Sequence, residues 1–397
     1  MNELKEIVLR PGKEDSLKRF HPWVFSGAIA RKPDSVEEGE VVRVLAADGS
    51  FLGVGHYQIG SIAVRILSFQ NEAIDISFYI RRIEQAYRLR QTLQLLRPDN
   101  NTFRLLHGEG DHLPGLIIDI YGNTAVVQAH SVGMHRDLSL IVNGLKQVLP
   151  ADRLQHIFYK SEGTLPYKAE VNAVDTYLMG GDQVDEVALE NGLQFYIDWL
   201  KGQKTGFFVD QRENRSLLEK YSAGRHVLNM FCYTGGFSVY ALRGGAASVD
   251  SVDSSSKAVS LTERNVTLNY GDEPRHKAVA DDAFKFLKQV PQGKYDLIVL
   301  DPPAFAKHRG AINNALQGYK KLNLSALEKL APGGILFTFS CSQAITKEQF
   351  RLAVFSAAAI SGRHVRILHQ LTQPADHPVN IYHPEGEYLK GLVLQVE

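Results

Sequence analysis

The residues with the clearest chemical potential are a carboxylate and a thiol, each placed directly after an apolar segment. Asp301 follows the segment 295–300, and Cys341 follows the segment 334–340. Apolar segments rich in β-branched residues that end abruptly in polar residues are typical of buried parallel strands, which carry ligands at their carboxyl ends. If the two strands are neighbours, they lie ~5 Å apart. Asp301 and Cys341 would then address the same flat base, which suits covalent chemistry on a pyrimidine.

Each of these two residues also has a simpler interpretation. Asp-Pro-Pro is a common turn after a strand, because proline fixes φ and keeps the preceding residue out of the helical region. A cysteine at the end of an apolar strand is often just a small buried side chain. The other cysteine, Cys232, lies in a glycine-rich turn, where packing is its natural role. Position and the flanking Ser340 and Ser342, which can hydrogen-bond a thiolate, favour Cys341 as the nucleophile.

A glycine-rich turn predicts part of a nucleoside site. The segment 227–238 has the pattern of a strand, a turn and a helix that begins at about Phe237. Its glycines allow the backbone to approach a ligand closely, and the helix start offers unpaired N–H groups. The spacing is neither G-x-G-x-x-G nor a P-loop, which disfavours a pyrophosphate ligand. The residues expected to contact the ligand are Phe231, Tyr233, Thr234, Gly235 and Gly236.

Acidic residues at further strand ends complete this site. Asp253 ends a strand about twenty residues after the turn, where a carboxylate can accept hydrogen bonds from ribose hydroxyls. Asp281 and Asp282 end a third predicted strand, and one of them is expected to bond an adenine amino group. Together with Asp301, these strand ends describe a nucleoside ligand without a diphosphate. S-adenosylmethionine is therefore the expected cofactor.

Five motifs carry a resemblance to a known family: 202–215, 231–238, 301–305, 340–342 and 384–390. On these motifs the chain resembles the class I methyltransferases, and more closely the ribosomal large-subunit methyltransferase I family, which makes 5-methylcytosine in 23S ribosomal RNA. The resemblance extends over nearly the whole chain. Two positions depart from the family pattern: Asn229 replaces the usual aspartate, and the pair Asp281-Asp282 leaves the adenine contact ambiguous.

The resemblance implies an α/β fold with a Rossmann-like, seven-stranded class I methyltransferase sheet in residues 187–397. A small β-barrel PUA domain that binds RNA is expected in residues 1–70. A helix and a small α+β domain for substrate recognition are expected in residues 73–186. The hydrophobic pattern agrees with this plan, since it predicts helices over about 74–96, 137–149 and 314–330. The resemblance further implies an antiparallel strand pair at 365–368 and 389–396 that completes the sheet.

The resemblance also implies roles for individual residues. Carbon 5 of cytosine is a poor nucleophile until a thiolate, here that of Cys341, adds to carbon 6. Asp301 is expected to line the cofactor site and to accept a hydrogen bond from the cytosine 4-amino group. Gln211 and Asn214 are expected to contact the cofactor. The remaining expected substrate contacts are Pro302, Pro303, Phe305, Lys204, Arg212 and Arg215.

Basic residues near the N-terminus are candidates for RNA contacts. Lys18, Arg19 and His21 are expected to bind phosphates, which receive most of the hydrogen bonds in such interfaces. Trp23 and Phe25 are expected to be core residues. The arginines of the first long helix form either a solvated face or a second phosphate-binding surface; they are Arg81, Arg82, Arg88 and Arg90. Four residues in one short segment resemble a set of metal ligands: His107, Glu109, Asp111 and His112. Glycines lie among them, so turn formation explains these polar residues, and no metal is expected.

Composition limits the remaining choices. The 397 residues carry 44 basic and 44 acidic side chains, so RNA binding must depend on a local basic face. Two cysteines are too few for a disulfide framework or a zinc site. Neither a signal peptide nor a membrane-spanning segment is expected, which predicts a cytoplasmic protein without a membrane partner. The expected partner is 23S ribosomal RNA, either naked or in an assembly intermediate of the large subunit, and a homodimer is left open.

Other functions remain open at this point. An N-methyltransferase that acts on guanine or adenine would need only the Asp-Pro-Pro rim, with Cys341 incidental. A nucleotide-dependent oxidoreductase is disfavoured by the missing G-x-G-x-x-G motif. A non-catalytic RNA-binding module is disfavoured by the set of strand ends suited to a cofactor.

Overall fold

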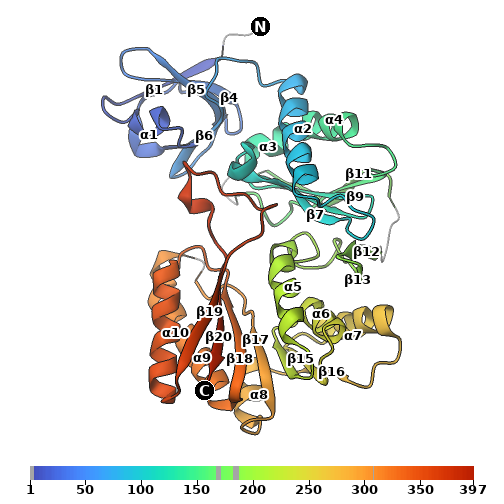
Figure 1. Ribbon diagram of the computed structural model, residues 1–397. Helices are drawn as coiled ribbons and strands as arrows, with labels where there is room; N and C mark the ends of the chain where they lie inside the picture. Colours follow the sequence, from blue (N-terminus) through green and yellow to red (C-terminus); the bar gives the residue numbers. More distant parts are fainter. Residues whose placement is uncertain (1–3, 167–170, 182–186, 307) are drawn as a thin grey trace. The chain divides into compact units, whose positions relative to one another are not determined.

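The computed structural model describes residues 4–166, 171–181, 187–306 and 308–397 (Figure 1). The chain divides into two compact units, and the backbone crosses between them five times. The N-terminal unit comprises Met1–Leu189, Ile197–Val209 and Ala375–Gly386. The C-terminal unit comprises Glu190–Tyr196, Asp210–Pro374 and Glu387–Glu397. Residues 375–386, which we call the C-terminal excursion, therefore belong to the N-terminal unit although both flanking segments belong to the other.

The N-terminal unit begins with a six-stranded sheet of order β2-β6-β5-β4-β1-β3. β1 and β4 are parallel, and the other neighbours are antiparallel. Apolar residues that alternate along the strands, such as Val42 and Val44, fill its core. The elements are β1 (Lys5–Leu9), α1 (Asp15–Lys18), β2 (Trp23–Phe25), β3 (Ile29–Arg31), β4 (Val41–Leu45), β5 (Phe51–Tyr57) and β6 (Ile62–Ser68).

A five-stranded sheet of order β11-β10-β9-β8-β7 follows in the same unit. Its core joins apolar residues of the strands to those of α2 and α4. Asp75 caps α2 by accepting a hydrogen bond from the Phe78 N–H, so the helix begins slightly later than the hydrophobic pattern predicts. The elements are α2 (Ile76–Thr92), β7 (Thr102–His107), β8 (Leu116–Tyr121), β9 (Thr124–Ala129), α3 (Val132–Arg136), α4 (Leu138–Val148), β10 (His156–Tyr159) and β11 (Thr176–Met179).

The C-terminal unit contains the predicted seven-stranded sheet, which is confirmed with the order β16-β15-β14-β17-β18-β20-β19. The first five strands in this order are parallel, and β20 is antiparallel to both of its neighbours. The strands are β14 (His226–Met230), β15 (Ser248–Asp253), β16 (His276–Ala280), β17 (Tyr295–Leu300), β18 (Leu330–Ser340), β19 (Val365–Leu371) and β20 (Lys390–Val396). The hairpin β12 (Val187–Glu190) and β13 (Leu193–Tyr196) precedes them.

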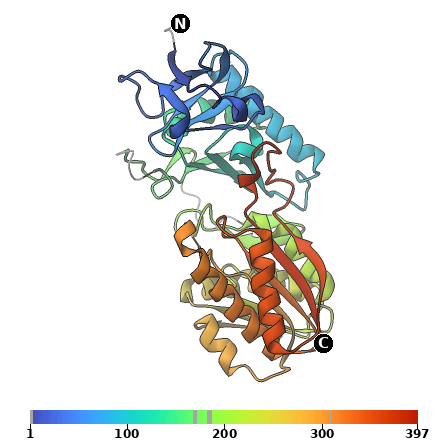
Figure 2. The same ribbon diagram turned by 90° about the vertical axis from the view of Figure 1, so that its left-hand side faces the viewer.

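Helices cover both faces of this sheet. Figures 1 and 2 show α8, α9 and α10 along one face, and their apolar side chains join those of the strands in one core. Figure 1 shows α5, α6 and α7 on the other side. The helices are α5 (Arg212–Tyr221), α6 (Gly236–Arg243), α7 (Ser256–Tyr270), α8 (Ala283–Gln289), α9 (Ile312–Lys329) and α10 (Lys347–Ser361). Two covered faces explain why the central strands are apolar without alternation.

One strand boundary differs from the sequence-based expectation. β18 begins at Leu330, whereas the glycine pair at 333–334 predicts a later start. The strand pairing shifts between Tyr295 and Leu297, and Gly333 lies there with a φ of 75°. A glycine adopts this left-handed conformation without strain, so the pair forms an irregularity inside the strand rather than its beginning.

Candidate active site

Two neighbouring strands place Asp301 and Cys341 at the same edge of the large sheet. β17 and β18 are parallel, with Leu300 opposite Thr338, and the two residues directly follow these strands. The Cys341 Sγ lies 3.9 Å from the carbonyl oxygen of Pro302, the residue after Asp301. The predicted neighbourhood of the two strands is therefore confirmed.

The pKa of the Asp301 carboxyl is raised. Desolvation raises its pKa to about 7, and the negative charge of Asp210 acts in the same direction. A hydrogen bond from Gln211 and the charge of Arg215 oppose this rise. A carboxyl with a pKa near neutrality can either donate or accept a proton at physiological pH.

The Cys341 thiol is held in its protonated form by its surroundings. Burial raises its pKa to about 12, and the charges of Asp301 and Asp210 add to the effect, while Lys390 lowers it. A thiol in this state is a poor nucleophile until positive charge is brought near it. A positive charge brought near the thiol would lower this pKa, as Lys390 already does in part.

Lys390 supports the turn that carries the thiol. It lies opposite Ser340 in the β18–β20 pair, and its buried Nζ donates hydrogen bonds to the carbonyl oxygens of Ser342 (2.7 Å) and Ile345 (2.8 Å). Burial lowers the pKa of Lys390 to about 8, and the charge of Cys341 opposes this. Sequence reasoning did not assign Lys390 a role, although it ends the motif 384–390.

The serines beside Cys341 have partners of their own, and their contact with a thiolate stays a prediction. Ser340 and Ser342 are fully buried, and their hydroxyls lie 2.9 Å from the hydroxyl of Tyr319 on α9. The Ser342 hydroxyl also accepts a hydrogen bond from the Ala306 N–H at 3.3 Å. These serines therefore hold the two strand ends together, because each can satisfy a buried polar partner.

Cys232 is placed as a packing residue. It is buried behind the glycine turn, and its sulfur lies 3.5 Å from the hydroxyl of Thr262. Burial raises the pKa of this thiol to about 12. Its position behind the turn agrees with the structural role expected from the sequence.

The glycine turn after β14 is strained and held from behind. Phe231 and Tyr233 adopt φ values of 60° and 48°, which cost energy for side chains with a Cβ, and Gly235 follows at 76°. Helix α7 stabilises this shape. Thr262 donates a hydrogen bond to the Tyr233 carbonyl and Asn265 donates one to that of Thr234. Neither of these two α7 residues was predicted, since nothing nearby in the sequence marks them.

The acidic strand ends keep capacity for a nucleoside. The two Asp253 carboxylate oxygens accept hydrogen bonds from the N–H groups of Tyr233 (3.1 Å) and Ser255 (2.9 Å), and each oxygen keeps a second lone pair. Asp282 caps α8 by accepting from the Lys285 N–H. Asp281 accepts a hydrogen bond from the Asp282 N–H at 2.8 Å and lies 3.5 Å from the Lys285 ammonium, both through Oδ1. We propose that its other carboxylate oxygen makes the adenine contact.

Residues 210–214, which begin the longest segment of the C-terminal unit, form a layer of polar side chains. Asn214 donates to the Gln211 side chain at 2.6 Å, and both are buried. Asp210, which was not predicted, accepts a hydrogen bond from the Tyr388 hydroxyl at 2.7 Å. Its other carboxylate oxygen is buried and has no hydrogen-bond partner among the described residues. A buried acceptor of this kind suits a ligand donor, so the layer fits a polar cofactor.

Two predicted substrate contacts are buried arginines. Arg215 forms a two-pronged ion pair with Glu190, with distances of 2.8 and 2.6 Å, and its side chain packs where a Cβ on Gly236 would lie 2.9 Å away. Arg212 pairs with Glu213 at 3.3 Å. Both guanidinium groups are nearly inaccessible to solvent. Arg215 therefore supports the glycine turn from behind.

The other expected base contacts differ in exposure. Pro302 is buried, Pro303 is exposed, and the half-buried Phe305 packs its ring 4.7 Å from that of Tyr319. Lys204 belongs to the N-terminal unit and is exposed, with a φ of 53°. Their contacts with a substrate remain predictions.

The candidate RNA contacts near the N-terminus lie at the surface of the N-terminal unit. Lys18 and Arg19 are exposed; Lys18 lies 3.5 Å from Glu14, and Arg19 donates a hydrogen bond to the Asp15 carbonyl. His21 is half-buried, and its Nδ1 accepts a hydrogen bond from the Trp23 N–H. Of the two aromatic residues expected in the core, Phe25 lies at the surface, so that expectation is wrong: its side chain is 46% exposed. Trp23 is half-buried and donates its indole N–H to Glu109.

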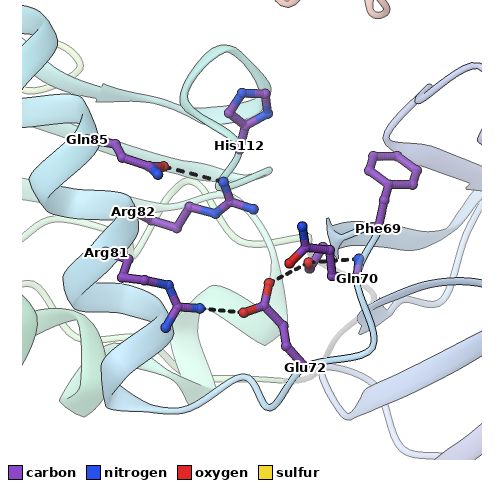
Figure 3. A pocket seen from close by; sticks show the side chains of 8 residues that line it. Phe69, Gln70, Glu72, Arg81, Arg82, Gln85 and His112 are labelled. Atoms are coloured by element: carbon purple, nitrogen blue, oxygen red, sulfur yellow. Dashed lines mark hydrogen bonds and ion pairs between the residues drawn. The ribbon is translucent and has the colours of Figure 1, made fainter.

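The arginines of α2 separate into two groups. Figure 3 shows a hollow in the N-terminal unit in which Arg81 pairs with Glu72 and Arg82 contacts Gln85. Arg90 does not belong to a solvated face or a phosphate-binding surface, because it is fully buried and pairs with Asp111. The residues that line the hollow are Ser68, Phe69, Gln70, Glu72, Arg81, Arg82, Gln85 and His112.

The acidic loop at 107–112 is occupied by internal partners. Glu109 accepts from Trp23 and pairs with Arg65 at 2.7 Å, and Asp111 pairs with Arg90.

A different group has the spacing of metal ligands: His21, His383 and Glu385. In this group the Nδ1 of His21 already accepts a hydrogen bond, so neutral His21 carries its proton on Nε2, the atom nearest Glu385. That proton favours an interaction with the carboxylate over metal binding.

Comparison with known proteins defines the family. A family model described as S-adenosylmethionine-dependent methyltransferase matches residues 164–384, and one described as PUA-like domain matches residues 7–69. The protein named ribosomal RNA large subunit methyltransferase I of Pseudoalteromonas atlantica is 40% identical over 395 residues, covering 98% of this chain and 99% of its own. That of Tolumonas auensis is 41% identical over 396 residues, covering 98% of each chain. The chain belongs to this methyltransferase family. Its cofactor is S-adenosylmethionine, as the strand ends predict.

Solved structures agree on the fold. A Streptococcus mutans protein described as a SAM-dependent methyltransferase superimposes with a TM-score of 0.83 at 24% identity, over 98% of this chain and 99% of its own. A methyltransferase structure complexed with SAH gives a TM-score of 0.84 at the same identity and coverage. Among the described residues, none of the helices is long and apolar enough to cross a membrane.

Proposed function

We propose that this methyltransferase modifies carbon 5 of a cytosine in 23S ribosomal RNA through a covalent adduct with Cys341. The observation that carries the proposal is the position of Cys341 beside Asp301, at the carboxyl ends of the adjacent strands β18 and β17. An N-methyltransferase would have no use for a thiol at this rim. The names of the relatives, which specify large-subunit ribosomal RNA, support the choice of substrate.

The cofactor fits the polar layer and the glycine turn. Asp253 would hold ribose hydroxyls, Asp281 the adenine amino group, and Asp210 with Gln211 the remaining polar groups of the ligand. S-adenosylmethionine supplies a methyl group on a positively charged sulfonium. A positive charge near the buried thiol would also lower its pKa from about 12, so that attack begins only in the loaded enzyme.

The side chains would then act in sequence. The Cys341 thiol loses its proton to water, and the thiolate sulfur forms a bond to cytosine carbon 6. The electron pair of the 5,6 double bond shifts away from carbon 6, so that carbon 5 becomes an enamine carbon able to accept the methyl group. Asp301, whose pKa is about 7, shares a proton with nitrogen 3 as negative charge develops there. After methylation, a base removes the carbon 5 proton, the carbon–sulfur bond breaks, and the thiolate is released.

The parts of the chain would divide the work. We propose that residues 1–70 and the middle domain, residues 73–186, capture RNA, while residues 187–397 bind the cofactor and carry out the chemistry. The exposed Lys18 and Arg19 support the first role. The target base would have to leave its stack to reach the rim, where Pro302, Pro303 and Phe305 would shape its slot.

Replacement of the thiol tests this function. Cys341→Ser keeps the shape but replaces a thiol with a far less acidic hydroxyl, so methyl transfer to cytosine should fall to background while cofactor binding persists. Cys232→Ser is the matched control and should keep most of its activity. Near wild-type methylation by Cys341→Ser would contradict the proposal.

An N-methyltransferase acting on guanine or adenine is the second candidate. The raised pKa of Cys341 favours it, because an inert thiol would suit a reaction that bypasses covalent attack. In that case Asp301 would still contact the base, and Asp301→Asn would reduce the rate while Cys341→Ser would not. The identity of the methylated base, read by mass spectrometry of RNA digests, separates the two.

A further inference from the structure

An aromatic group is exposed on the N-terminal unit beside basic residues. Phe20 and Tyr382 are 48% and 49% exposed, and their ring centroids lie 5.3 Å apart. Phe69 is half-buried, and its ring is perpendicular to that of Phe20, with the ring centroids 5.3 Å apart. We call Phe20, Tyr382 and Phe69 the aromatic platform. Burial in the core would be the usual fate of such rings, so their exposure requires an explanation.

The backbone holds one of these rings outward at a cost. Phe20 has a φ of 63°, a left-handed conformation that a bulky side chain adopts only where its surroundings enforce it. Its N–H donates to the Leu17 carbonyl at 2.8 Å, which fixes the turn after α1. Strain of this kind is concentrated at binding sites. The preceding residues Lys18 and Arg19 are exposed and basic.

The second ring is presented by the C-terminal excursion, which is anchored firmly within the N-terminal unit. The Asp376 carboxylate accepts from the Arg104 N–H at 3.0 Å, and its carbonyl accepts from the buried Arg90 at 2.7 Å. A ring on an anchored segment loses little conformational freedom when it binds a ligand.

The platform adjoins the hollow of Figure 3. Phe69, whose ring supports Phe20, is also one of the residues that line the hollow, and Arg81 and Arg82 lie across from it. Arg82 donates to the Leu67 carbonyl and makes a long 3.4 Å contact with Gln85. A stacking surface beside cationic groups is the combination that proteins use to hold single-stranded nucleic acid.

From this arrangement we propose that the aromatic platform and the hollow bind one unpaired nucleotide of the RNA substrate. The base stacks on Phe20 and Tyr382, and a neighbouring phosphate lies in the hollow with Arg82. Double-stranded RNA does not fit this site, because its bases are stacked within the helix. The inference deepens the proposed function, on which the choice of RNA as the ligand rests.

Anisotropy of a fluorescein-labelled single-stranded oligoribonucleotide, compared with a duplex of the same sequence, tests the site. Phe20→Ala and Tyr382→Ala should each weaken single-strand binding by about 5- to 100-fold, the usual loss for one stacked base, and should alter duplex binding much less. Tyr382→Trp should retain binding. Phe355→Ala is the matched control, because Phe355 is 65% exposed on α10 in the C-terminal unit.

The hollow is tested in the same assay. Arg82→Gln should weaken single-strand binding and reduce its salt dependence. Arg97→Gln should not, because Arg97 is a half-buried arginine of the same unit that pairs with Asp99 outside the hollow. Thermal melting of each variant shows whether the fold is kept; if Arg82→Gln unfolds the protein, the two exposed platform variants decide the question.

Other results would overturn the proposal. Unchanged single-strand affinity in the double variant Phe20→Ala, Tyr382→Ala would do so, and so would an equal loss for single strand and duplex. A change of oligomeric state in that variant, without an effect on RNA, would identify the platform as a protein interface. Failure of the cytosine chemistry is distinguishable, because Cys341→Ser should bind the single strand as the wild type does.

Discussion

Replacement of Lys390 by methionine probes how the protein controls its thiol. The ammonium is buried and donates to two carbonyl oxygens of the turn after β18, at 2.7 and 2.8 Å. Hydrogen bonds from a charged donor contribute about 1.5–3 kcal/mol each, and removal of a buried charge returns part of its desolvation cost. We expect a net loss of about 2 kcal/mol of stability.

The same variant should make Cys341 less reactive. Lys390 lowers the pKa of this thiol, so its removal raises that pKa further. The thiolate fraction at any pH below that pKa should therefore fall, and alkylation should slow in the same proportion. The assay is alkylation by iodoacetamide between pH 7 and 10, followed by intact mass in a Cys232→Ser background.

An exposed lysine provides the control for this measurement. Lys347 on α10 forms a surface ion pair with Glu387 at 2.8 Å, so Lys347→Met should leave both melting temperature and alkylation nearly unchanged. The reasoning is refuted if Lys390→Met melts like the wild type and its Cys341 is alkylated with the same pH profile.

Three further predictions follow from the other contacts. Asp253→Ala should weaken S-adenosylmethionine binding by about 1–3 kcal/mol in calorimetry, because buried ribose donors lose their acceptor. Asp272→Ala, in an exposed loop, should leave the affinity unchanged. Equal affinity of Asp253→Ala and the wild type would remove Asp253 from the site. Lys18→Gln combined with Arg19→Gln should reduce the slope of log affinity for single-stranded RNA against log salt by about 1.4, and an unchanged slope would exclude both phosphate contacts. Burial lowers the pKa of His276 to about 4, so the folded state keeps this side chain neutral and loses stability as the pH falls from about 6.5 towards 4. His276→Gln should therefore lose less melting temperature between pH 7 and 5 than the wild type, with His226→Gln as a surface control; parallel losses would contradict the assignment.

The chemistry at the strand ends could be predicted because it depends on neighbours in the sequence. Asp253 and Asp301 each follow an apolar strand, and parallel strands bring their carboxyl ends to one edge. The presence of a positive charge, the Lys390 ammonium, beside the turn that carries Cys341 could not be predicted in this way. Lys390 is far from Cys341 in the sequence, and only the antiparallel pairing of β18 and β20 brings its ammonium to the turn.

The side-chain partners that the sequence did not predict have a common physical origin. Ser340 and Ser342 appeared available to a thiolate, but α9 packs Tyr319 against them, and a buried hydroxyl must be satisfied. Arg90 appeared solvated on its own helix, but a distant loop supplies Asp111. In both cases tertiary packing determines which residue is the hydrogen-bond or ion-pair partner, and local sequence patterns do not indicate it. The strained φ values of Phe231 and Tyr233 are hidden for the same reason, since Thr262 and Asn265 of α7 enforce that turn.

The most direct test of covalent catalysis is the capture of the adduct itself. Wild-type protein would be incubated with S-adenosylmethionine and target RNA that carries 5-fluorocytosine, because fluorine blocks the elimination that frees the thiol. We expect a stable protein–RNA adduct whose peptide mass maps the linkage to Cys341, absent in Cys341→Ser and present in Cys232→Ser. Methylation of unmodified RNA without any trapped adduct, or an adduct that maps to Cys232, would contradict the proposed role of Cys341.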